Sequence, residues 1–334
     1  MAAEAKRPSP PDIVWALSTA AFAARCLHVV ADLGIADHIG EQPVRISELA
    51  SSCGVDPDAL DRVLRLLSTH GIFQREHGSY GHTPSSLLLR SDHPMTMRAF
   101  AQMMGLPFTW GSLTEFKHSV LTGRPAVEVL EPKGAFAYLQ DRPDEAEIFA
   151  RAMTAKAIVD VKAVIDAYDF TRCGQIADIG GGRGHLLRAI LEAAPGAEGI
   201  LFDLPMVIDT LDADDQPRLT LQAGDFFVDA LPSADAYILM EVLHDWPDKQ
   251  CGAILSAIRD AAPDNATVLV VEDLMPEEQS DPSASTLDVI MLTVTGGRER
   301  TVDQLRNLFE GAGFDLARVI ETSSSMHIVE AQPT

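Results

Sequence analysis

Residues 176–186 read Ile-Ala-Asp-Ile-Gly-Gly-Gly-Arg-Gly-His-Leu, which predicts a short strand followed by a glycine turn. A helix is expected to begin at Leu186, directly after the turn. Glycine adopts positive φ without strain and lets a ligand approach the backbone, so this turn is a candidate binding loop. It does not match a phosphate-binding Walker A loop, because no Gly-Lys-Ser or Gly-Lys-Thr follows. A tight turn without a ligand is the alternative interpretation.

The sequence after Gln175 alternates between short apolar strands and helices. The expected strands are 176–179, 199–202, 219–222, 236–240, 267–272, 314–319 and 326–330. The expected helices between them are 186–194, 249–262 and 302–312. This alternation predicts an α/β fold with a Rossmann-like, doubly wound and mainly parallel sheet. Ligands in such folds lie at the carboxyl ends of the strands.

Two nucleotide cofactors are candidates for the glycine turn. In the Gly-x-Gly-x-x-Gly pattern of dinucleotide sites, Gly180 and Gly182 fit, but His185 stands where a small residue is required. Asp203 follows the next strand about 20 residues later, where a carboxylate accepts hydrogen bonds from ribose hydroxyls. NAD and S-adenosylmethionine both contain such a ribose, so Asp203 does not choose between them.

The third expected strand ends in Gly224-Asp225-Phe226-Phe227. An acid beside an aromatic ring suits an adenine base. The carboxylate accepts a hydrogen bond from the exocyclic amine, and the ring covers the face of the base. Packing within the core is the alternative role for Phe226 or Phe227.

A long apolar segment near the N-terminus predicts a helix over 13–39, with Asp12 as its N-cap. Apolar residues occupy much of its circumference: Val14, Leu17, Phe22, Leu27, Val29, Val30 and Leu33. Such a helix must be buried, either by its own domain or by a partner subunit. No signal peptide is expected, because Met1 to Pro11 contain no apolar core. No uninterrupted apolar run reaches the roughly 18 residues of a membrane span.

Residues 46–82 have the pattern of a winged helix: two short helices and a hairpin. Ser47 or Asp56 is a candidate N-cap, and residues 72–74 and 79–82 predict the two strands. The second helix has apolar residues at the spacing of one face: Leu60, Val63, Leu64 and Leu67. Its surface mixes acids with arginines instead of presenting a basic stripe, which argues against DNA binding. We therefore expect a structural or dimerisation module.

The net charge and the cysteine spacing indicate which binding partners and which cellular compartment the protein is suited to. The formal net charge is −23, from 49 acidic and 26 basic residues. A polyanion repels nucleic acid and anionic membrane surfaces. The four cysteines, Cys26, Cys53, Cys173 and Cys251, are far apart and form no Cys-x-x-Cys pair. This spacing indicates neither a zinc site nor a disulfide framework and favours the reduced cytoplasm.

Five motifs occur in the order and rough spacing of one enzyme family. They are Asp178-Ile179-Gly180-Gly181-Gly182-Arg183-Gly184, Phe202-Asp203-Leu204-Pro205, Gly224-Asp225-Phe226-Phe227, Glu241-Val242-Leu243-His244-Asp245-Trp246 and Gly296-Gly297-Arg298-Glu299-Arg300-Thr301. The chain resembles the caffeate-type S-adenosylmethionine-dependent O-methyltransferases, a class I family of plant phenylpropanoid enzymes and bacterial enzymes of secondary metabolism. The resemblance implies that residues 1–112 form an N-terminal helical, winged-helix dimerisation domain of a homodimer. Residues 113–334 would form the S-adenosylmethionine-binding catalytic domain. Its first part, up to about 170, is mostly helical and broken at prolines.

The resemblance also implies roles for individual residues. Cofactor contacts are expected from Gly180, Gly182, Asp203, Leu204, Asp225, Phe226 and Met240. His244 matches the catalytic base, and Glu272 and Glu299 match its two supporting acids. One position departs from the plant members, which often carry a lysine where this chain has Met240. Any cofactor contact from Met240 is therefore limited to its backbone or thioether.

The same residues support this chemistry on physical grounds. A neutral imidazole, with a pKa of about 6.5, removes the proton of a phenol of pKa about 10 when held within hydrogen-bonding range. His244 lies just past strand 236–240, at the edge of the sheet where ligands bind. A carboxylate on the other ring nitrogen fixes the tautomer, and we favour Glu299 over Glu272 for this role. A solvated loop charge between two arginines is the alternative role for Glu299.

The sequence leaves other functions open. An N- or C-methyltransferase of the same fold is one alternative to methylation of a small aromatic hydroxyl. A catalytically inactive winged-helix regulatory protein is another, but the presence of His244, Glu272 and Glu299 argues against it. A nicotinamide-dependent oxidoreductase is a third, but it would match Gly-x-Gly-x-x-Gly better and would lack the His244-Asp245-Trp246 segment. No metal is expected, because no His-x-x-x-His pair or clustered carboxylate set is present. Asp288 is expected to cap or orient a helix at 289–292.

Overall fold

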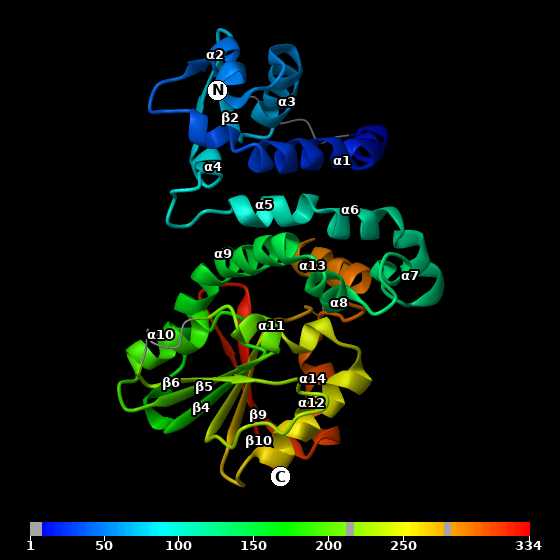
Figure 1. Ribbon diagram of the computed structural model, residues 1–334. Coiled ribbons are helices and arrows are strands. Elements are labelled where there is room, and N and C mark those ends of the chain that lie inside the picture. Colours follow the sequence, from blue (N-terminus) through cyan, green and yellow to red (C-terminus); the bar gives the residue numbers. More distant parts are fainter. Residues whose placement is uncertain (1–8, 212–216, 277–281) are drawn as a thin grey trace. The chain divides into compact units, whose positions relative to one another are not determined.

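The computed structural model describes residues 9–211, 217–276 and 282–334 of the chain. The chain divides into two compact units, Met1–Leu106 and Pro107–Thr334 (Figure 1). The boundary lies a few residues before the one expected between residues 112 and 113. Each unit has its own hydrophobic core and is described separately below.

The second unit is built on a seven-stranded sheet with the order β6-β5-β4-β7-β8-β10-β9. Its strands are β4 Gln175–Ile179, β5 Glu198–Asp203, β6 Leu219–Ala223, β7 Ala236–Met240, β8 Thr267–Asp273, β9 Phe314–Glu321 and β10 Met326–Pro333. β4 to β8 are parallel, whereas β10 runs antiparallel to both β8 and β9. The predicted doubly wound, mainly parallel α/β sheet is confirmed. The carboxyl ends of the parallel strands β4 to β8 lie along one edge of this sheet.

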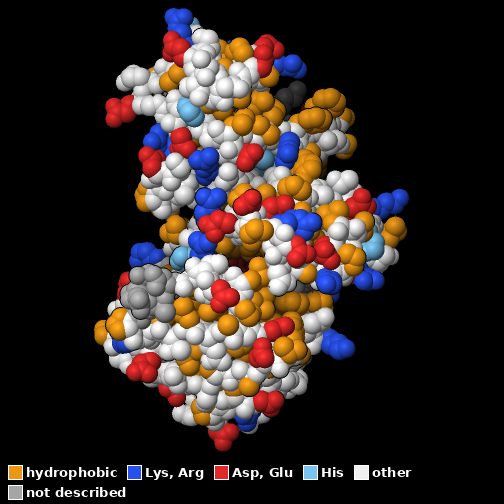
Figure 2. Space-filling model, in the orientation of Figure 1, with side chains coloured by type: hydrophobic (Ala, Val, Ile, Leu, Met, Phe, Trp, Pro, Cys, Tyr) orange, Lys and Arg blue, Asp and Glu red, His pale blue; other side chains and the backbone are white. Residues whose placement is uncertain are grey.

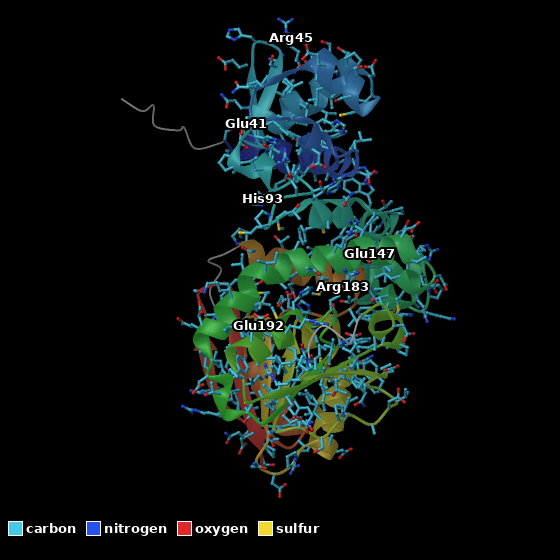
Figure 3. All side chains as sticks on the ribbon, turned by 60° about the vertical axis from the view of Figure 1, so that its left-hand side comes forward. Glu41, Arg45, His93, Glu147, Arg183 and Glu192 are labelled. Carbon is cyan, nitrogen blue, oxygen red and sulfur yellow. The ribbon has the colours of Figure 1, made fainter. Side chains whose placement is uncertain are left out.

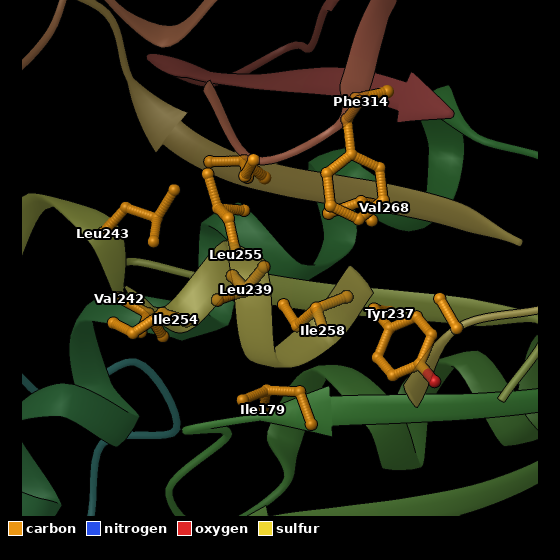
Figure 4. Close-up of a cluster of buried hydrophobic side chains, with 14 of the residues drawn as sticks. Ile179, Tyr237, Leu239, Val242, Leu243, Ile254, Leu255, Ile258, Val268 and Phe314 are labelled. Atoms are coloured by element: carbon orange, nitrogen blue, oxygen red, sulfur yellow. The ribbon is translucent and has the colours of Figure 1, made fainter. Parts of the chain in front are cut away.

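Helices cover both faces of this sheet (Figure 1). α9, Pro143–Ala167, and α10, His185–Ala193, lie on one face, where a core forms around Leu187 and Ile190. α12, Asp248–Ala261, and α14, Val302–Gly311, lie on the other. There the strands are buried under a second core, whose members include Leu239, Ile254, Leu255, Ile258 and Phe314 (Figure 4). Burial on both faces explains why these strands are continuous apolar runs.

Short helices complete the second unit. They are α6 Pro107–Thr114, α7 Phe116–Thr122, η2 Ala126–Val129, α8 Ala135–Gln140, η3 Phe170–Arg172, α11 Pro205–Ile208, η5 Leu243–Asp245 and α13 Pro282–Val294. The expected breaks at prolines are confirmed: Pro125 and Pro132 lie between helices, and Pro143 is the first residue of α9. Proline suits that position because the first turn of a helix needs no donor from its backbone nitrogen.

The first unit contains the predicted winged helix. Its elements are α1 Pro10–Asp32, η1 Ile35–His38, β1 Val44–Arg45, α2 Ile46–Cys53, α3 Pro57–Thr69, β2 Phe73–Glu76, β3 Ser79–His82, α4 Pro84–Leu87 and α5 Arg98–Gly105. The Asp56 carboxylate accepts from the Ala59 nitrogen at 2.8 Å and caps α3, whereas Ser47 lies inside α2 and caps nothing. Leu60, Leu64 and Leu67 of α3 are buried in the core of the unit.

The prediction for the first helix was wrong at both ends. α1 begins at Pro10, and Asp12 lies inside its first turn, where it accepts from the backbone nitrogen of Ser9 at 3.0 Å and from the hydroxyl at 2.6 Å. Ser9 is therefore the N-cap. The helix ends before Gly34, whose φ of +65° breaks the α-helical path.

α1 leaves most of its apolar surface exposed within one chain. Val14, Trp15, Leu17 and Phe22 are each more than 60% exposed, and hydrophobic side chains reach the surface of this unit in the space-filling view (Figure 2). With 23 residues and a mean hydropathy of 1.6 over an 18-residue window, α1 is long and apolar enough to cross a membrane by length and composition alone. The expectation from uninterrupted runs missed this, although the core helix of a soluble protein and a signal sequence pass the same test.

Candidate active site

The carboxyl ends of the parallel strands bring the predicted site residues to one edge of the sheet. In strand order they are Asp225 and Phe226 after β6, Asp203 and Leu204 at β5, Gly180 and Gly182 after β4, Met240 and His244 at β7, and Glu272 at β8. Glu299 joins them from the segment before α14. The order of the strands thus brings residues that are far apart in sequence to this edge, and the segment before α14 adds Glu299.

The glycine turn is shaped to receive a ligand. Gly180 and Gly182 have φ of +72° and +58°, and no atom of the described residues lies within 4 Å of a Cβ placed on Gly182. The Asp203 carboxylate accepts from the backbone nitrogens of Gly182 and Leu204, both at 2.7 Å. Asp203 is thus fixed at the mouth of the turn, and Gly182 leaves open space beside it.

Asp178 lies beneath the turn and was missed as a site residue. Its side chain is 1% exposed, and neither carboxylate oxygen meets a hydrogen-bond partner among the described residues. Burial, followed by the nearby charge of Asp203, raises the pKa of Asp178 to about 7. A Cβ on Gly181 would lie 2.4 Å from this carboxyl, so the turn can pass over Asp178 only with glycine there.

Aromatic rings gather beside the glycine turn. Phe226 and Phe227 meet edge to face with ring centroids 4.8 Å apart, and Trp246 packs against both. The Asp225 carboxylate accepts from the Phe227 nitrogen at 2.9 Å, which fixes the bend between acid and rings. Met240 packs partly buried against the core on the α9 side of the sheet.

Helix α9 holds the glycine turn from outside. Arg183 donates to Glu147 at 2.5 Å, and the two side chains lie together in Figure 3. Thr154 lies further along α9 than Glu147, and its hydroxyl is 2.8 Å from the His185 Nε2. Neither contact was expected from the sequence, because the partners are more than 30 residues apart.

His244 is held by two buried glutamates. Its Nδ1 lies 2.9 Å from Glu299 Oε1, and its backbone nitrogen donates to Glu272 Oε1, also at 2.9 Å. All three residues are at most 5% exposed. The sequence favoured Glu299 over Glu272 as the partner of the ring, and the structure places Glu299 there. A solvated loop charge is excluded for Glu299.

The charges around His244 favour its protonated form. Burial lowers the pKa of His244, but the hydrogen bond that its ring donates to Glu299 and the charges of Asp245 and Glu272 outweigh burial and raise that pKa to about 9. Asp245 Oδ1 lies 3.9 Å from Nε2, on the opposite side of the ring from Glu299. Burial raises the pKa of Glu272 to about 7. An imidazolium formed at this position is therefore strongly stabilised.

The segment 296–301 clamps the loop that carries His244. The Arg298 nitrogen donates to the His244 carbonyl at 2.9 Å. Arg300, 1% exposed, donates to the carbonyls of Leu243 at 2.8 Å and Trp246 at 2.7 Å. A Cβ on Gly297 would lie 1.9 Å from the His244 carbonyl oxygen. The motif at 296–301 therefore has two roles: it packs against the His244 loop, and it supplies Glu299.

Asp288 has a different role from the one expected. It lies inside α13, which begins at Pro282, so it caps no helix. Its carboxylate accepts from the Glu299 backbone nitrogen at 3.0 Å. Asp288 therefore orients Glu299, which in turn orients His244.

Two family profiles match the chain. The O-methyltransferase domain matches residues 114–315, and the O-methyltransferase dimerisation domain matches residues 15–92. The phenazine O-methyltransferase PhzM of Lysobacter antibioticus is 38% identical over 327 residues, covering 96% of this chain and 96% of the relative. The 8-amino-8-demethylriboflavin N,N-dimethyltransferase of Streptomyces davaonensis is 31% identical over 320 residues, covering 92% and 91%.

Solved structures share the whole architecture. The crystal structure of LaPhzM matches with a TM-score of 0.92 and 38% identity, covering 98% of this chain and 100% of that one. The O-methyltransferase NcsB1 from neocarzinostatin biosynthesis was solved with S-adenosylmethionine and 2-hydroxy-5-methyl naphthoic acid. It matches with a TM-score of 0.81 and 32% identity, covering 94% and 96%.

Proposed function

Because the chain belongs to the S-adenosylmethionine-dependent O-methyltransferase family, we propose that it methylates a hydroxyl of a small aromatic acceptor with His244 as general base. The observation that carries this proposal is the buried imidazole whose Nδ1 lies 2.9 Å from Glu299 at the ligand edge of the sheet. The aromatic acceptor of NcsB1 supports the acceptor class.

The proposed cofactor site consists of the residues along the carboxyl edge. Asp203 would accept from the ribose hydroxyls, Asp225 and Phe226 would bind the adenine, and Met240 would contribute its backbone or thioether. Gly180, Gly182 and Leu204 would contact the cofactor through their backbone. The fit rests on the open space at Gly182 and on the unpartnered, buried Asp178 beneath the turn. When bound, S-adenosylmethionine supplies a methyl group already activated by a sulfonium.

His244 removes the hydroxyl proton in this mechanism. In this proposal the neutral imidazole carries its proton on Nδ1, where Glu299 accepts it, and presents Nε2 as the base. With the cofactor bound, Nε2 would take the proton of the acceptor hydroxyl as that oxygen receives the methyl group. The resulting imidazolium lies between Glu299 and Asp245, whose charges stabilise it. Glu272 holds the backbone of His244 and sets the position of the ring.

Glu299→Gln is expected to move the pH dependence of methyl transfer to lower pH. Only neutral His244 accepts a proton, so kcat/KM rises with pH toward the raised pKa of about 9 in the parent protein. Glutamine keeps an oxygen that accepts from Nδ1 but removes the charge, so the midpoint falls by about one pH unit or more. The plateau rate falls as well, because a weaker base drives proton transfer less. An unchanged midpoint in the pH profile of kcat/KM contradicts the role of Glu299.

The acceptor class is tested with labelled S-adenosylmethionine and a panel of matched hydroxy- and amino-aromatic compounds. We expect label in the oxygen-methylated products. The dimethyltransferase relative acts on nitrogen by its name, and N-methyl transfer is therefore the second candidate. Label only in the amino-aromatic products would replace the proposed acceptor class with that one.

We also propose that the protein is a cytoplasmic homodimer formed through its first unit. The dimerisation-domain match and the exposed apolar side chains of α1 support the dimer. Four free cysteines suit a reducing compartment.

The double change Leu17→Asp with Phe22→Asp is expected to abolish the dimer. Both side chains are more than 70% exposed on one chain, and a carboxylate in an apolar interface must lose its hydration. Sedimentation should give twice the chain mass of 36.1 kDa for the parent and the single mass for the variant. Met95→Asp, on the same unit and 46% exposed, serves as the matched control and should remain dimeric. A parent protein that sediments as a monomer contradicts the proposal.

A further inference from the structure

An ion pair joins helix α9 to the turn that leads to His244. The Lys156 ammonium donates to Glu241 Oε1. The pair is largely shielded from water, because the Lys156 side chain is 24% exposed and that of Glu241 is 15% exposed. Such a pair is stronger than one at the surface, since solvent screens it less.

Glu241 occupies an unusual backbone position. Its φ is +54°, a left-handed conformation that a long side chain rarely adopts. The Glu241 nitrogen donates to the Val271 carbonyl at 2.9 Å, which ties the turn to β8. His244 follows three residues later, so the direction of its loop depends on this turn. A strained position of this kind persists only where neighbouring groups hold it, and Lys156 is such a neighbour.

The Lys156 charge faces several carboxylates. Besides Glu241, it interacts electrostatically with Asp160 on its own helix and with Glu299. Burial lowers the pKa of Lys156, but the Glu241 charge outweighs burial and raises it, so the ammonium stays charged. Burial raises the pKa of both Asp245 and Asp273 of β8, and the Lys156 charge offsets part of this rise.

Some of the carboxylates that interact with Lys156 also face His244. Asp245, Glu272 and Glu299 all favour the imidazolium, and the Lys156 ammonium interacts with two of them, Asp245 and Glu299. We propose that Lys156 is a positioning residue for the methyl transfer: it holds the Glu241 turn and balances the carboxylates around the imidazole. This inference rests on the proposed function, in which His244 is the base.

The direct test is a titration of His244 that requires no turnover. Protein labelled with ¹³C at histidine Cε1 is titrated by NMR, and the His244 signal is identified by its loss in His244→Gln. Lys156→Met is expected to raise the pKa of His244, whereas Glu241→Gln, which leaves the ammonium unbalanced, is expected to lower it. A change of about half a pH unit or more in each direction is expected, because charges that are largely shielded from water act on one another more strongly than exposed ones. Lys156→Arg should restore the parent value.

Opposite directions distinguish an electrostatic role from a purely structural one. Loss of packing alone would move both variants the same way or leave both unchanged, and either result overturns the proposal. Lys162→Met is the matched control, because Lys162 lies on α9 and pairs with the exposed Asp166. If Lys156→Met does not fold, Lys156→Gln, which also removes the charge, takes its place in the comparison with Glu241→Gln. A failed methyl-transfer assay with the expected titrations would count against the proposed function and leave the charge balance supported.

Discussion

His244→Ala is expected to lower methyl transfer by about 10²–10⁴-fold, the usual contribution of a positioned general base. The loss should appear in kcat, because the imidazole accepts the hydroxyl proton during the chemical step and does not bind the cofactor. Binding of S-adenosylhomocysteine, measured by calorimetry, should stay within a few-fold of the parent, since the proposed cofactor residues lie on β4, β5, β6 and the end of β7.

A control histidine separates this effect from general damage. His77 lies in the hairpin of the first unit with a side chain 93% exposed and a φ of +48°. His77→Asn keeps a residue that tolerates this conformation, so transfer should be unchanged. A loss of less than about tenfold in His244→Ala would remove its role as general base.

Gly297→Ala is expected to cause the second large loss. The added Cβ would lie 1.9 Å from the His244 carbonyl oxygen and 2.5 Å from the Asp245 carbonyl carbon. Both are backbone atoms, so the loop itself must move. Misplacement by about 1 Å costs about 10²-fold in rate, and overpacking of this type costs about 1–3 kcal/mol in stability. Single-turnover transfer and urea unfolding measure the two effects.

Gly252→Ala provides the matched glycine control. Gly252 lies inside α12, and nothing lies within 4 Å of a Cβ placed there. This change should leave transfer intact and stabilise the helix by up to about 1 kcal/mol. Equal behaviour of the two alanine variants would mean that the 296–301 segment does not fix the His244 loop.

Local patterns in the sequence predicted the sheet because strands buried on both faces leave continuous apolar runs. The seven strands, the winged helix and the family are confirmed. Helix α1 was harder: its apolar pattern runs past Gly34, and only the left-handed φ at that glycine shows where the helix stops. Asp12 resembled an N-cap because it participates in the cap, although from inside the first turn.

Motif matching placed His244, Glu272 and Glu299 at one site, and their catalytic roles stay predictions. Contacts between distant elements could not be predicted from motifs. Lys156 meets Glu241 across 85 positions, and Arg300 reaches two carbonyls more than 50 positions away. These pairings depend on how helices pack on the sheet, which no short pattern records. Asp178 belonged to a recognised motif, but its burial without a partner is visible only in three dimensions.

The most direct test of general-base catalysis compares the parent with His244→Ala across hydroxyaromatic acceptors of graded acidity. Single-turnover transfer is measured at one pH with saturating S-adenosylmethionine. An acceptor that is already ionised needs no base, so the defect of the variant should be largest for phenols of pKa about 10 and shrink toward none as the acceptor becomes more acidic. A defect of the same size for every acceptor would contradict the account and leave His244 a structural residue.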